Sequence, residues 1–593
     1  MLRETPFSPV DERVGKWREG CPVTHSPHWG IIFLVLRRMR APLAVLISIF
    51  ALAVLGLTVI PGIEVDGVAR RMSFFHAFYF ISYTATTIGF GEVPIEFSEA
   101  QRMWVTACIY LSVIGWAYAI GSLFALMQDA AFRDAVRTER FSREVRRLGE
   151  PFYLVCGYGE TGRLVTRALD HLGIRVVAIE IDPVKAAELD LHSLWADVPN
   201  LVGDAGRPQV LRLAGLEKPQ CRGVMALTNN DQTNLAIAIA ARLLAPDVPA
   251  LCRTRSVEIA ANMASFGTRH IINPFEKFGE YLALALHSPS AYHLLEWLTG
   301  IDGTEVKPHR DPPRGTWVLC GYGTFGRLLA ESLESEQMPI VLIDRDPPPD
   351  GTRHRWVQGD GTCAPALRQA GIEEACGIVA CTGSDVDNLS ICVTARELNP
   401  DLFVVVRQNH YSNNPLFEAF ESDARVVPSR IIAHECLAIL TTPLLVPFLD
   451  EVKRSREDWA ASLLDRMTDR FGWHVPHVWS IRINASEAPA LFALLMPAGP
   501  EVTIDALLRD HARREHGLAC EVLFVRRDDG TRTLLPDSNY RIQAGDELLI
   551  VGDRLARNHL ALTLENPNTL DYVLTGQDLP GGWVWQRLAR RSG

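Results

Sequence analysis

Two long uncharged stretches stand out in the pattern of apolar and polar residues. Residues 41–63 and residues 103–127 contain no charged side chain. Roughly 20 helical residues are enough to cross the hydrocarbon core of a bilayer. A removable signal peptide explains the first stretch poorly, because no small-residue cleavage site follows it. The pattern therefore predicts two membrane-spanning helices.

A shorter apolar segment, residues 72–84, lies between the two spans and is rich in aromatic side chains. It is too short to cross a membrane together with the glycine-containing sequence that follows. Irregular backbone is tolerated at membrane depth only where it lines a water-filled path or is buried in protein. Residues 72–92 therefore predict a re-entrant pore helix and loop, in which the C-terminal helix dipole favours a cation. A buried extracellular helix is the alternative.

Basic residues are distributed unevenly around the two spans. Arg37, Arg38 and Arg40 precede the first span, and the loop 64–102 has three arginines among several acids. Six arginines follow the second span: Arg133, Arg137, Arg140, Arg143, Arg146 and Arg147. Basic flanks stay on the cytoplasmic side of a membrane. We therefore expect a multi-pass protein of the cell (inner) membrane with both termini in the cytoplasm.

Downstream of the spans, short apolar runs alternate with helical patterns. The run 152–156 leads into Gly157-Tyr158-Gly159-Glu160-Thr161-Gly162, a helical pattern and a second apolar run that contains Glu180. In this context Gly157, Gly159 and Gly162 predict a tight turn and a close approach of the backbone to a pyrophosphate at the helix N-terminus. Glu180, about 20 residues on, predicts a partner for ribose hydroxyls.

The same series recurs later in the chain. Gly321, Gly323 and Gly326 follow an apolar run, and Asp344 ends the next one. Further residues match at one common spacing: Asn234 with Asn388, Pro274 with Pro428, and Pro289 with Pro443. The chain therefore repeats a whole Rossmann-like domain. Each copy ends in a helical stretch broken by proline, residues 275–298 and 430–449, of a kind that can exchange between neighbouring domains.

The acids at the strand ends indicate the ligand. Glu180 and Asp344 favour an unphosphorylated ribose, hence NAD(H) or an adenine nucleotide over NADP. Arg345 weakens that inference for the second copy. The alternative for Glu180 and Asp344 is an ordinary solvated acid at a strand end. Asp204 and Asp360, each preceded by glycine, either line the same pockets or cap helices.

The composition limits the classes of ligand and partner that the protein is expected to bind. The net charge of −11 argues against nucleic-acid binding. The twelve cysteines include no CxxC pair and no metal-ligand spacing, so we expect reduced core residues and no metal site. Calcium stays open as a further ligand, since acidic residues are plentiful, although no EF-hand loop is present.

The expected domain order follows from these patterns: an N-terminal cytoplasmic arm (1–40), a pore domain (41–128), a helical linker (129–150), a first Rossmann-like domain with crossover helices (151–311), a second Rossmann-like domain (314–450), a linker (451–475), a small α+β domain (476–553) and a C-terminal tail (554–593). Residues 31–36 either lie along the inner membrane surface or extend the first span. The linker 129–150 is expected to continue the second span as one helix. Trp583 and Trp585 in the tail are expected to be packing anchors.

Residues 87–91, Thr-Ile-Gly-Phe-Gly, resemble the selectivity filter of potassium channels, whose usual form is Thr-Val-Gly-Tyr-Gly. Such a filter needs backbone carbonyls that replace the water shell of an ion, and glycine allows backbone conformations that a Cβ hinders. The resemblance assigns Thr87, Ile88, Gly89, Phe90 and Gly91 to the filter. Phe90 and Glu92 depart from the usual Tyr and Asp, which affects the packing behind the filter. Taken alone, the pentapeptide is equally typical of an ordinary glycine-rich turn.

Residues 41–550 together resemble a two-transmembrane potassium channel fused to tandem RCK domains, the regulators of potassium conductance of TrkA-N and TrkA-C type. The implied fold is an α-helical pore domain, two α/β Rossmann-like domains and a small α+β domain. The resemblance also implies a homotetramer in a lipid bilayer, with eight Rossmann-like domains in a cytoplasmic ring. It implies a gating hinge at Gly115, for which close helix packing is the alternative. Residues 305–314 are too short to hold a small C-terminal domain for the first copy, which leaves the closure of the ring open.

The resulting hypothesis is a K⁺-selective channel that NAD(H) or an adenine nucleotide gates through the ring. One alternative is a membrane-anchored, NAD-binding regulatory subunit of a potassium transporter, although an anchor has no need of residues 87–91. The other is a membrane-anchored NAD-dependent oxidoreductase. The sequence offers no catalytic constellation, and His434-Glu435 is more typical of a structural pair on an apolar helix. We therefore expect that the protein is not an enzyme.

Overall fold

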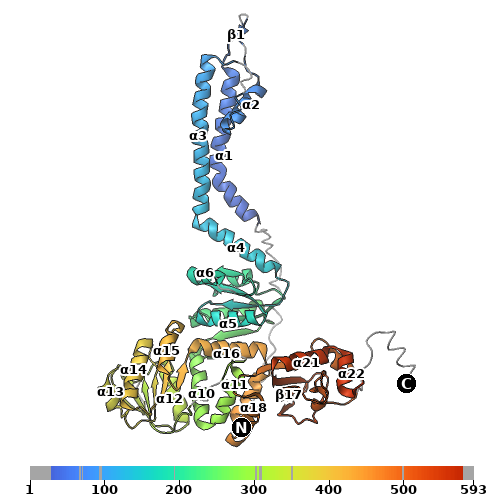
Figure 1. Ribbon diagram of the computed structural model, residues 1–593. Coiled ribbons are helices and arrows are strands. Elements are labelled where there is room, and N and C mark those ends of the chain that lie inside the picture. Colours follow the sequence, from blue (N-terminus) through green and yellow to red (C-terminus); the bar gives the residue numbers. More distant parts are fainter. Residues whose placement is uncertain are drawn as a thin grey trace, which may run out of the picture. The chain divides into compact units, whose positions relative to one another are not determined.

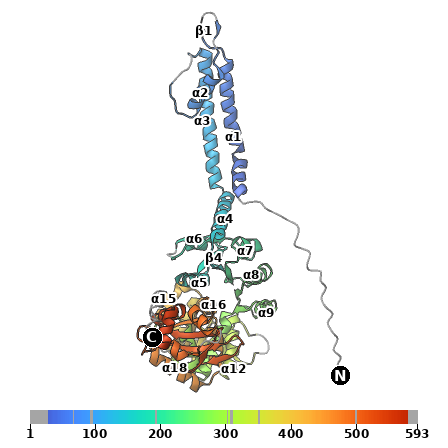
Figure 2. The same cartoon turned by 90° about the vertical axis from the view of Figure 1, so that its right-hand side faces the viewer.

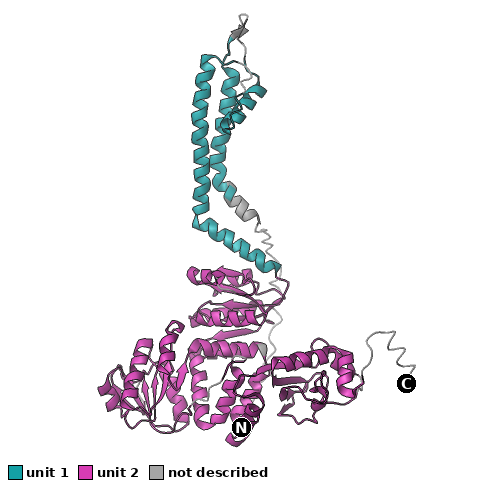
Figure 3. Cartoon of the chain, viewed as in Figure 1, with its two compact units in different colours: residues 1–147 teal, residues 148–593 magenta. Residues whose placement is uncertain are grey.

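The computed structural model describes residues 28–65, 68–69, 71–91, 96–191, 194–300, 303–305, 310–348, 352–496 and 500–577. The chain divides into two compact units, residues 1–147 and residues 148–593 (Figure 3). The N-terminal residues 1–27, Glu92 next to the filter segment, and Trp583 and Trp585 in the tail lie outside the described residues.

The first unit consists mainly of helices. They are α1 (His28–Val59), α2 (Phe74–Ala85), α3 (Glu99–Gln128) and α4 (Ala130–Arg147), with a short antiparallel strand pair, β1 (Glu64–Val65) and β2 (Val68–Ala69) (Figure 1). Within the described residues, Arg37–Val59 and Glu99–Gln128 are each long and apolar enough to cross a membrane. Only 22% of the most apolar window of each helix is buried, so most of their apolar surface must face lipid or other protein chains.

Helices α1 and α3 lie side by side, and α2 packs against both of them (Figures 1 and 2). The indole of Trp104 donates a hydrogen bond of 3.2 Å to the carbonyl oxygen of Ala53. The same ring lies over Gly56, where a Cβ would come within 2.1 Å of it. Residues 31–36 belong to α1, so they extend the first span and do not form a separate surface helix.

The expected continuous helix from the second span into residues 129–150 is interrupted at Asp129. This residue has an extended backbone (φ −65°, ψ 123°), which ends α3 and precedes α4. Its carboxylate accepts a hydrogen bond from the backbone N–H of Phe132 at 3.2 Å and another from the Arg38 guanidinium at 3.0 Å. An Asp that can cap a new helix with its side chain competes with helix continuation. The structure therefore has two helices here, joined at one residue.

The first Rossmann-like domain opens the second unit. Its parallel sheet has the order β5-β4-β3-β6-β7-β8. The strands are β3 (Phe152–Cys156), β4 (Arg175–Glu180), β5 (Asn200–Val202), β6 (Cys221–Ala226), β7 (Ala250–Arg253) and β8 (His270–Ile272). The helices are α5 (Glu160–His171), α6 (Pro183–Leu191), α7 (Pro208–Leu213), α8 (Asp231–Leu244) and α9 (Val257–Ser265). This is the doubly wound order whose switch point lies between the first and fourth strands.

The second copy repeats the architecture with a parallel sheet of order β11-β10-β9-β12-β13-β14. Its strands are β9 (Trp317–Cys320), β10 (Ile340–Asp344), β11 (Arg355–Gln358), β12 (Gly377–Ala380), β13 (Phe403–Arg407) and β14 (Ala424–Val426). Its helices are α12 (Thr324–Ser335), α13 (Ala364–Gln369), α14 (Asp385–Leu398), η1 (Tyr411–Asn413) and α15 (Asn414–Phe420). The predicted fold of a helical membrane part followed by two Rossmann-like domains is confirmed.

The proline-broken helices after each sheet are exchanged between the two copies. These helices are α10 (Pro274–His287), α11 (Pro289–Thr299), α16 (Pro428–Thr441) and α17 (Leu445–Arg454). Helix α10 packs on α12 of the second copy, and α16 packs on α5 of the first. The bent pair α16 and α17 also passes the length and composition test for a span. However, Cys436 and Phe448 on this pair are fully buried inside the second unit, so it forms part of the protein core.

The small domain lies after α18 (Glu457–Phe471), which packs against α11 in a shared core and is thus more than a linker. Its main antiparallel sheet has the order β15-β20-β17-β18, and β16 pairs with β19. The elements are β15 (His477–Arg482), α19 (Pro489–Leu495), β16 (Val502–Thr503), α20 (Ile504–Leu507), β17 (Cys520–Arg526), β18 (Arg532–Leu534), β19 (Arg541–Ile542), β20 (Glu547–Gly552), α21 (Arg554–Glu565) and α22 (Pro567–Thr575).

The start of the expected tail belongs to this small domain. Helices α21 and α22 contribute Ala556, Leu560, Leu564 and Leu570 to its buried core. The domain therefore extends to Thr575, beyond the expected end at residue 553, because these helices bury an apolar face against the sheet.

Candidate ion pathway and nucleotide sites

The filter segment follows directly on α2. The helix begins at its N-cap Ser73, whose hydroxyl accepts a hydrogen bond from the backbone N–H of His76 at 3.4 Å, and it ends at Thr86. The backbone N–H groups of Ile88 and Gly89 both donate to the carbonyl oxygen of Tyr83, at 3.0 and 3.2 Å. The Trp116 indole on α3 donates to the carbonyl oxygen of Ala85 at 2.9 Å. These hydrogen bonds hold the end of α2 and the start of the following loop in place.

The backbone of the filter segment alternates in conformation. Thr87, Gly89 and Gly91 have φ of 62°, 61° and 74°, whereas Ile88 and Phe90 are not among the described residues with positive φ. Alternation of left-handed and ordinary residues turns successive carbonyls toward the same side of a chain, whereas a regular strand turns them to opposite sides. Positive φ is uncommon for a β-branched residue such as Thr87, so the backbone is held there in an unfavourable conformation.

The carbonyl oxygens of residues 87–91 have no hydrogen-bond donor among the residues that the structure describes. The side chains of Ile88 and Phe90 are 61% and 69% exposed in the single chain, and Phe90 meets the ring of Tyr83 edge-on at 6.0 Å. A row of unbonded carbonyls beside exposed apolar side chains is what one quarter of a filter requires.

Gly115 lies in the middle of α3, buried against α1. A Cβ there would come within 2.8 Å of Ile49 and 3.2 Å of Leu46. The structure thus shows the close-packing alternative, and α3 runs through Gly115 without interruption. The hinge role stays a prediction.

The glycine loop of the first Rossmann-like copy has the geometry of a pyrophosphate cradle. Gly157 has φ of 100°, and a Cβ on it would meet the backbone nitrogen of Thr228 at 2.9 Å. A Cβ on Gly162 would lie 1.9 Å from the carbonyl oxygen of Gly157, so no larger residue fits. A Cβ on Gly159 would meet nothing within 4 Å, and no side chain caps α5 there. The helix N-terminus therefore faces open space where a phosphate can reach its N–H groups.

The second copy reproduces this cradle closely. Gly321 has φ of 102°, and a Cβ on Gly326 would lie 2.1 Å from the carbonyl oxygen of Gly321. A Cβ on Gly323 meets nothing within 4 Å, and α12 likewise has no side-chain cap at its start. The residues present in both copies thus fit a bound dinucleotide or nucleotide diphosphate.

The acids at the ends of the second strands are tied to these loops. Glu180 accepts hydrogen bonds from the backbone N–H of Tyr158 at 2.5 Å and of Asp182 at 3.0 Å. Asp344 accepts from Tyr322 at 2.6 Å and from Asp346 at 3.0 Å. Glu180 is buried, so it is not the solvated strand-end acid of the alternative reading. Each acid stands beside its glycine loop, where a ribose would lie.

Asp204 and Asp360 mainly shape local turns. Asp204 accepts the backbone N–H of Gly206 at 2.9 Å and lies 3.5 Å from Arg207. Asp360 accepts the N–H of Thr362 at 3.0 Å and the guanidinium of Arg345 at 3.3 Å. Hydrogen bonds from the hydroxyl and the N–H of Thr362, together with Arg345, hold the pKa of Asp360 below its ordinary value. Both acids are bonded within their own copy, and a direct role in ligand binding stays a prediction.

Two arginines that sequence reasoning did not single out lie at the ends of β7 and β13. Arg253 in the first copy donates to the side chain of Asn229 at 2.9 Å, and its buried Nε has no hydrogen-bond partner among the described residues. Burial, followed by repulsion from Arg255, lowers the pKa of Arg253 to about 10. Its counterpart Arg407 stacks on Phe275 at 4.7 Å and Phe325 at 5.6 Å. The repeat spacing that pairs Asn234 with Asn388 also pairs Arg253 with Arg407. This spacing is the sequence signal from which the two arginines could have been found.

The first cradle also contacts the second copy. Glu160, in the first turn of α5, accepts a hydrogen bond from the backbone N–H of Tyr411 at 2.9 Å and lies 3.5 Å from the hydroxyl of Ser429. The glycine loop of one copy and the loop after β13 of the other are therefore directly bonded. A ligand at the first cradle lies beside the interface of the two domains.

Comparison with known proteins gives matches in the same order along the chain. The ion channel family matches residues 43–129. The TrkA-N domain family matches twice, at residues 153–274 and 317–428. The two families together account for more than half of the chain.

Similar proteins include potassium channel protein 1 of Methanocaldococcus jannaschii, 25% identical over 235 residues, which are 39% of this chain and 67% of that protein. The voltage-gated potassium channel Kch of Escherichia coli is 27% identical over 182 residues, 30% of this chain and 41% of that one. An uncharacterized protein of Methanothermus fervidus is 29% identical over 245 residues, 41% of this chain and 37% of that one. The chain thus spans between about a third and two thirds of the length of these curated relatives.

Among solved structures, the GsuK channel bound to NAD is similar over 90% of this chain and 100% of that chain, with 17% identity and a TM-score of 0.43. Two of the three curated relatives are named as potassium channels, in agreement with the expectation that the protein is not an enzyme. One ion-channel match is followed by two TrkA-N matches. The chain therefore belongs to the two-span ion channels that carry tandem TrkA-N, or RCK, domains.

Proposed function

We propose that the protein is a K⁺-selective channel of the cell membrane, gated by NAD(H) or an adenine nucleotide bound to its Rossmann-like domains. Both termini lie in the cytoplasm, since arginines flank the spans on that side. The observation that carries the proposal is the filter segment, where φ alternates and the carbonyls of residues 87–91 accept no hydrogen bond within the described chain.

One chain supplies one wall of a pore, so the proposal includes a homotetramer. Four copies would surround the axis with rings of carbonyl oxygens from Thr87, Ile88, Gly89, Phe90 and Gly91. The exposed apolar side chains of Ile88 and Phe90 would be covered by neighbouring chains. The largely unburied faces of α1 and α3 would be divided between lipid and the other subunits.

The nucleotide acts as a regulator through differential affinity. A ligand shifts a conformational equilibrium only if it binds one state more tightly than the other. The bond between Glu160 and the backbone of Tyr411 places the first cradle at the interface of the two copies, so a bound diphosphate can favour one arrangement of that interface. The chain connection through α4 then passes the change to α3 and the pore.

The test is K⁺ flux into liposomes that contain the purified full chain, with and without NAD⁺, NADH, ATP and ADP. The proposal expects a flux that prefers K⁺ to Na⁺ and that at least one nucleotide changes. K⁺ flux without any nucleotide response would support the pore assignment and contradict nucleotide gating. Absence of flux under all conditions would favour a membrane-anchored regulatory subunit.

A filter variant separates the pore from the rest of the protein. Gly89 has φ of 61° and open space around its Cβ position, so Gly89→Ala strains the backbone without a clash. The variant is expected to abolish K⁺ flux while nucleotide binding stays at the wild-type level. The matched control is Gly121→Ala, a helical position with no atom within 4 Å of the added Cβ. Unchanged flux in Gly89→Ala would reject the pore assignment.

A further inference from the structure

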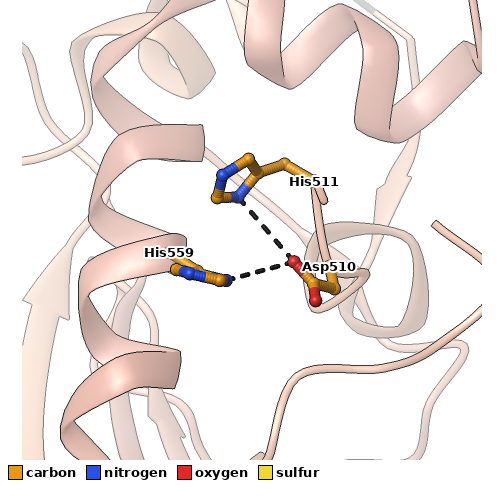
Figure 4. Close-up of side chains that lie close together, drawn as sticks. All are labelled: Asp510, His511 and His559. Atoms are coloured by element: carbon orange, nitrogen blue, oxygen red, sulfur yellow. Dashed lines mark hydrogen bonds and ion pairs between the residues drawn. The ribbon is translucent and has the colours of Figure 1, made fainter. Parts of the chain in front are cut away.

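The small C-terminal domain brings two neighbouring metal-ligand side chains, Asp510 and His511, together with a third that is distant in the sequence, His559. Asp510 and His511 lie in the loop after α20, and His559 lies on α21. One oxygen or ring nitrogen from each residue lies within 4.8 Å of the others. Figure 4 shows both imidazole rings turned toward the carboxylate of Asp510. No other group of three or more such ligands occurs within the described residues.

The distances are close to those of a metal-ligand set. The Asp510 Oδ1 atom lies 3.1 Å from His559 Nδ1 and 3.9 Å from His511 Nδ1. Tetrahedral Zn²⁺ with bonds of about 2.0–2.1 Å to nitrogen and oxygen separates its ligand atoms by about 3.3 Å. The Asp510–His559 pair is near this spacing, although it forms a hydrogen bond in the structure, and a ligand atom of His511 lies within 4.8 Å of the other two.

The state of His511 points to a missing partner. Its Nδ1 atom is buried and has no hydrogen-bond partner within the described residues, although the Asp510 carboxylate is the group it faces. Buried polar atoms in folded proteins are normally satisfied, so an orphan of this kind calls for an ion or another ligand. Such an ion would be bound by Nδ1 of both histidines and by the Asp510 carboxylate.

We propose that Asp510, His511 and His559 form a site for a divalent transition-metal ion such as Zn²⁺. Imidazole and carboxylate ligands suit Zn²⁺, whereas Ca²⁺ and Mg²⁺ prefer oxygen ligands only. Three protein ligands leave the fourth tetrahedral position to water. The site goes beyond the proposed channel function and beyond the prediction from the cysteines, which showed no metal-ligand spacing.

The ion would fasten helices α21 and α22 to the rest of the small domain. The loop that carries Asp510 and His511 also carries Arg514, whose guanidinium donates to the carbonyl oxygens of Val573 and Leu574 at 2.9 Å each, near the end of α22. A metal that joins this loop to His559 would bind the loop to α21 as well. The helices α21 and α22 would then be held at two points, because binding to the folded arrangement alone stabilises it.

The test uses the full chain, purified in detergent and stripped with a chelator, in a Cys363→Ser background that removes the one exposed thiol among the described cysteines. Zn²⁺ per chain is measured by equilibrium dialysis and mass spectrometry. His559→Gln and His511→Gln are compared with His516→Gln, an exposed histidine of the same loop outside the cluster. We expect one Zn²⁺ fewer per chain in each of the first two variants, with affinity reduced at least about 100-fold, and no change in His516→Gln.

Two further measurements guard against misfolded variants. Co²⁺ bound to the wild type should give the strong visible absorption of a four-coordinate site, and His559→Gln should lose it while nucleotide binding is retained. Zn²⁺ should slow hydrogen exchange in residues 509–517 and 554–565 of the wild type only. Equal Zn²⁺ binding by the wild type and both ligand variants would overturn the site. Binding without slower exchange would overturn its fastening role.

Discussion

The two Rossmann-like copies share their glycine loops but differ in what surrounds them. Gly157 and Gly321 have φ of 100° and 102°. A Cβ added to the third glycine of each loop, Gly162 or Gly326, would lie 1.9 or 2.1 Å from the carbonyl oxygen of the first glycine. Beside the ribose acids, however, the first copy has Ile181, and the second has Arg345 bonded to Asp360. Backbone geometry is thus repeated, while side-chain chemistry has diverged. Two glycine loops with the same backbone geometry therefore need not prefer the same ligand.

A second difference concerns the arginine at the end of the fifth strand. Both arginines have a buried Nε without a hydrogen-bond partner among the described residues, but Arg253 in the first copy stands among polar groups. In the second, Arg407 lies against two phenylalanine rings, one of them Phe325 from the glycine loop itself. The position of Phe325 is held by Thr161 in the first copy. The first cradle is therefore the more polar of the two, and we expect it to be the tighter diphosphate site.

The largest effect is expected from charge reversal at the open glycine. Gly159→Asp places a carboxylate where nothing lies within 4 Å, so the fold tolerates it while the added charge repels a pyrophosphate. Affinity at the first copy should fall on the order of 100-fold or more. Gly323→Asp is the matched variant for the second copy. Isothermal titration with NAD⁺ and ADP reports both. Loss of the weaker binding step in Gly159→Asp and of the tighter step in Gly323→Asp would contradict the expectation that the first copy is the tighter site.

The ribose acids should have the next largest effect. Glu180→Gln and Asp344→Asn remove a charged acceptor that the glycine loop and the proposed ribose share. A hydrogen bond to a charged group contributes about 1.5–3 kcal/mol, so affinity should fall about 10- to 100-fold at the altered copy. Titration of each variant with NAD⁺ checks this. Wild-type affinity in both variants would show that the acids only support the loop.

Exchanging the neighbours of these acids should alter ligand preference rather than affinity. Ile181→Arg gives the first copy the guanidinium of the second, and Arg345→Ile does the reverse. Because a guanidinium binds a phosphate group well, the ratio of NADP⁺ to NAD⁺ affinity should rise on the order of tenfold in Ile181→Arg. It should fall in Arg345→Ile. Competition between the two nucleotides measures the ratio, and a shift in the same direction for both variants would refute the assignment.

Acidification should affect the second copy slightly more than the first. Burial favours a raised pKa for Asp385, but hydrogen bonds from Asn409, Asn413 and His410 outweigh it and hold the pKa below the ordinary value. A depressed folded pKa contributes stability above the unfolded value of about 3.9, and this is lost as the pH falls through the folded value. The counterpart Asp231 has one carboxylate oxygen without a partner within the described residues.

After correction for the slower intrinsic exchange of amides in acid, protection against hydrogen exchange should therefore fall more in the loop after β13, residues 408–413, than in the corresponding loop after β7, residues 254–256. The comparison is made between neutral pH and a pH below about 3.9. An equal loss of protection in both loops would contradict the asymmetry. The effect is the smallest of those expected here, because it concerns one carboxylate.

Local pattern was enough to predict much of the molecule. Two uncharged runs and the flanking arginines depend on composition alone. The glycine series and the following acids are also local, and both loops have the expected geometry. The positive φ at Gly89 and Gly91 belongs to this class as well, since glycine permits that backbone, whereas the positive φ at Thr87 was not predicted. The repeat of these signals revealed the tandem domains.

Other features depended on residues that meet only in the folded chain. Asp129 interrupts the predicted linker helix because Arg38, far away in sequence, shares its carboxylate. Helices α21 and α22 join the small domain because their apolar faces find its sheet. The stacking of Arg407 on Phe275 likewise needs the exchange of helices between copies.

By itself, then, the sequence predicted the two spans, the backbone conformation at Gly89 and Gly91, the two glycine loops and their order, because each depends on residues close together in the chain. The tertiary structure alone decided where the helices end, how the copies exchange helices and which side chains surround each cradle. It also decided the cluster of Asp510, His511 and His559, in which the carboxylate and the second imidazole are 49 residues apart. No local periodicity encodes such a contact, since it arises from the packing of a loop against a helix.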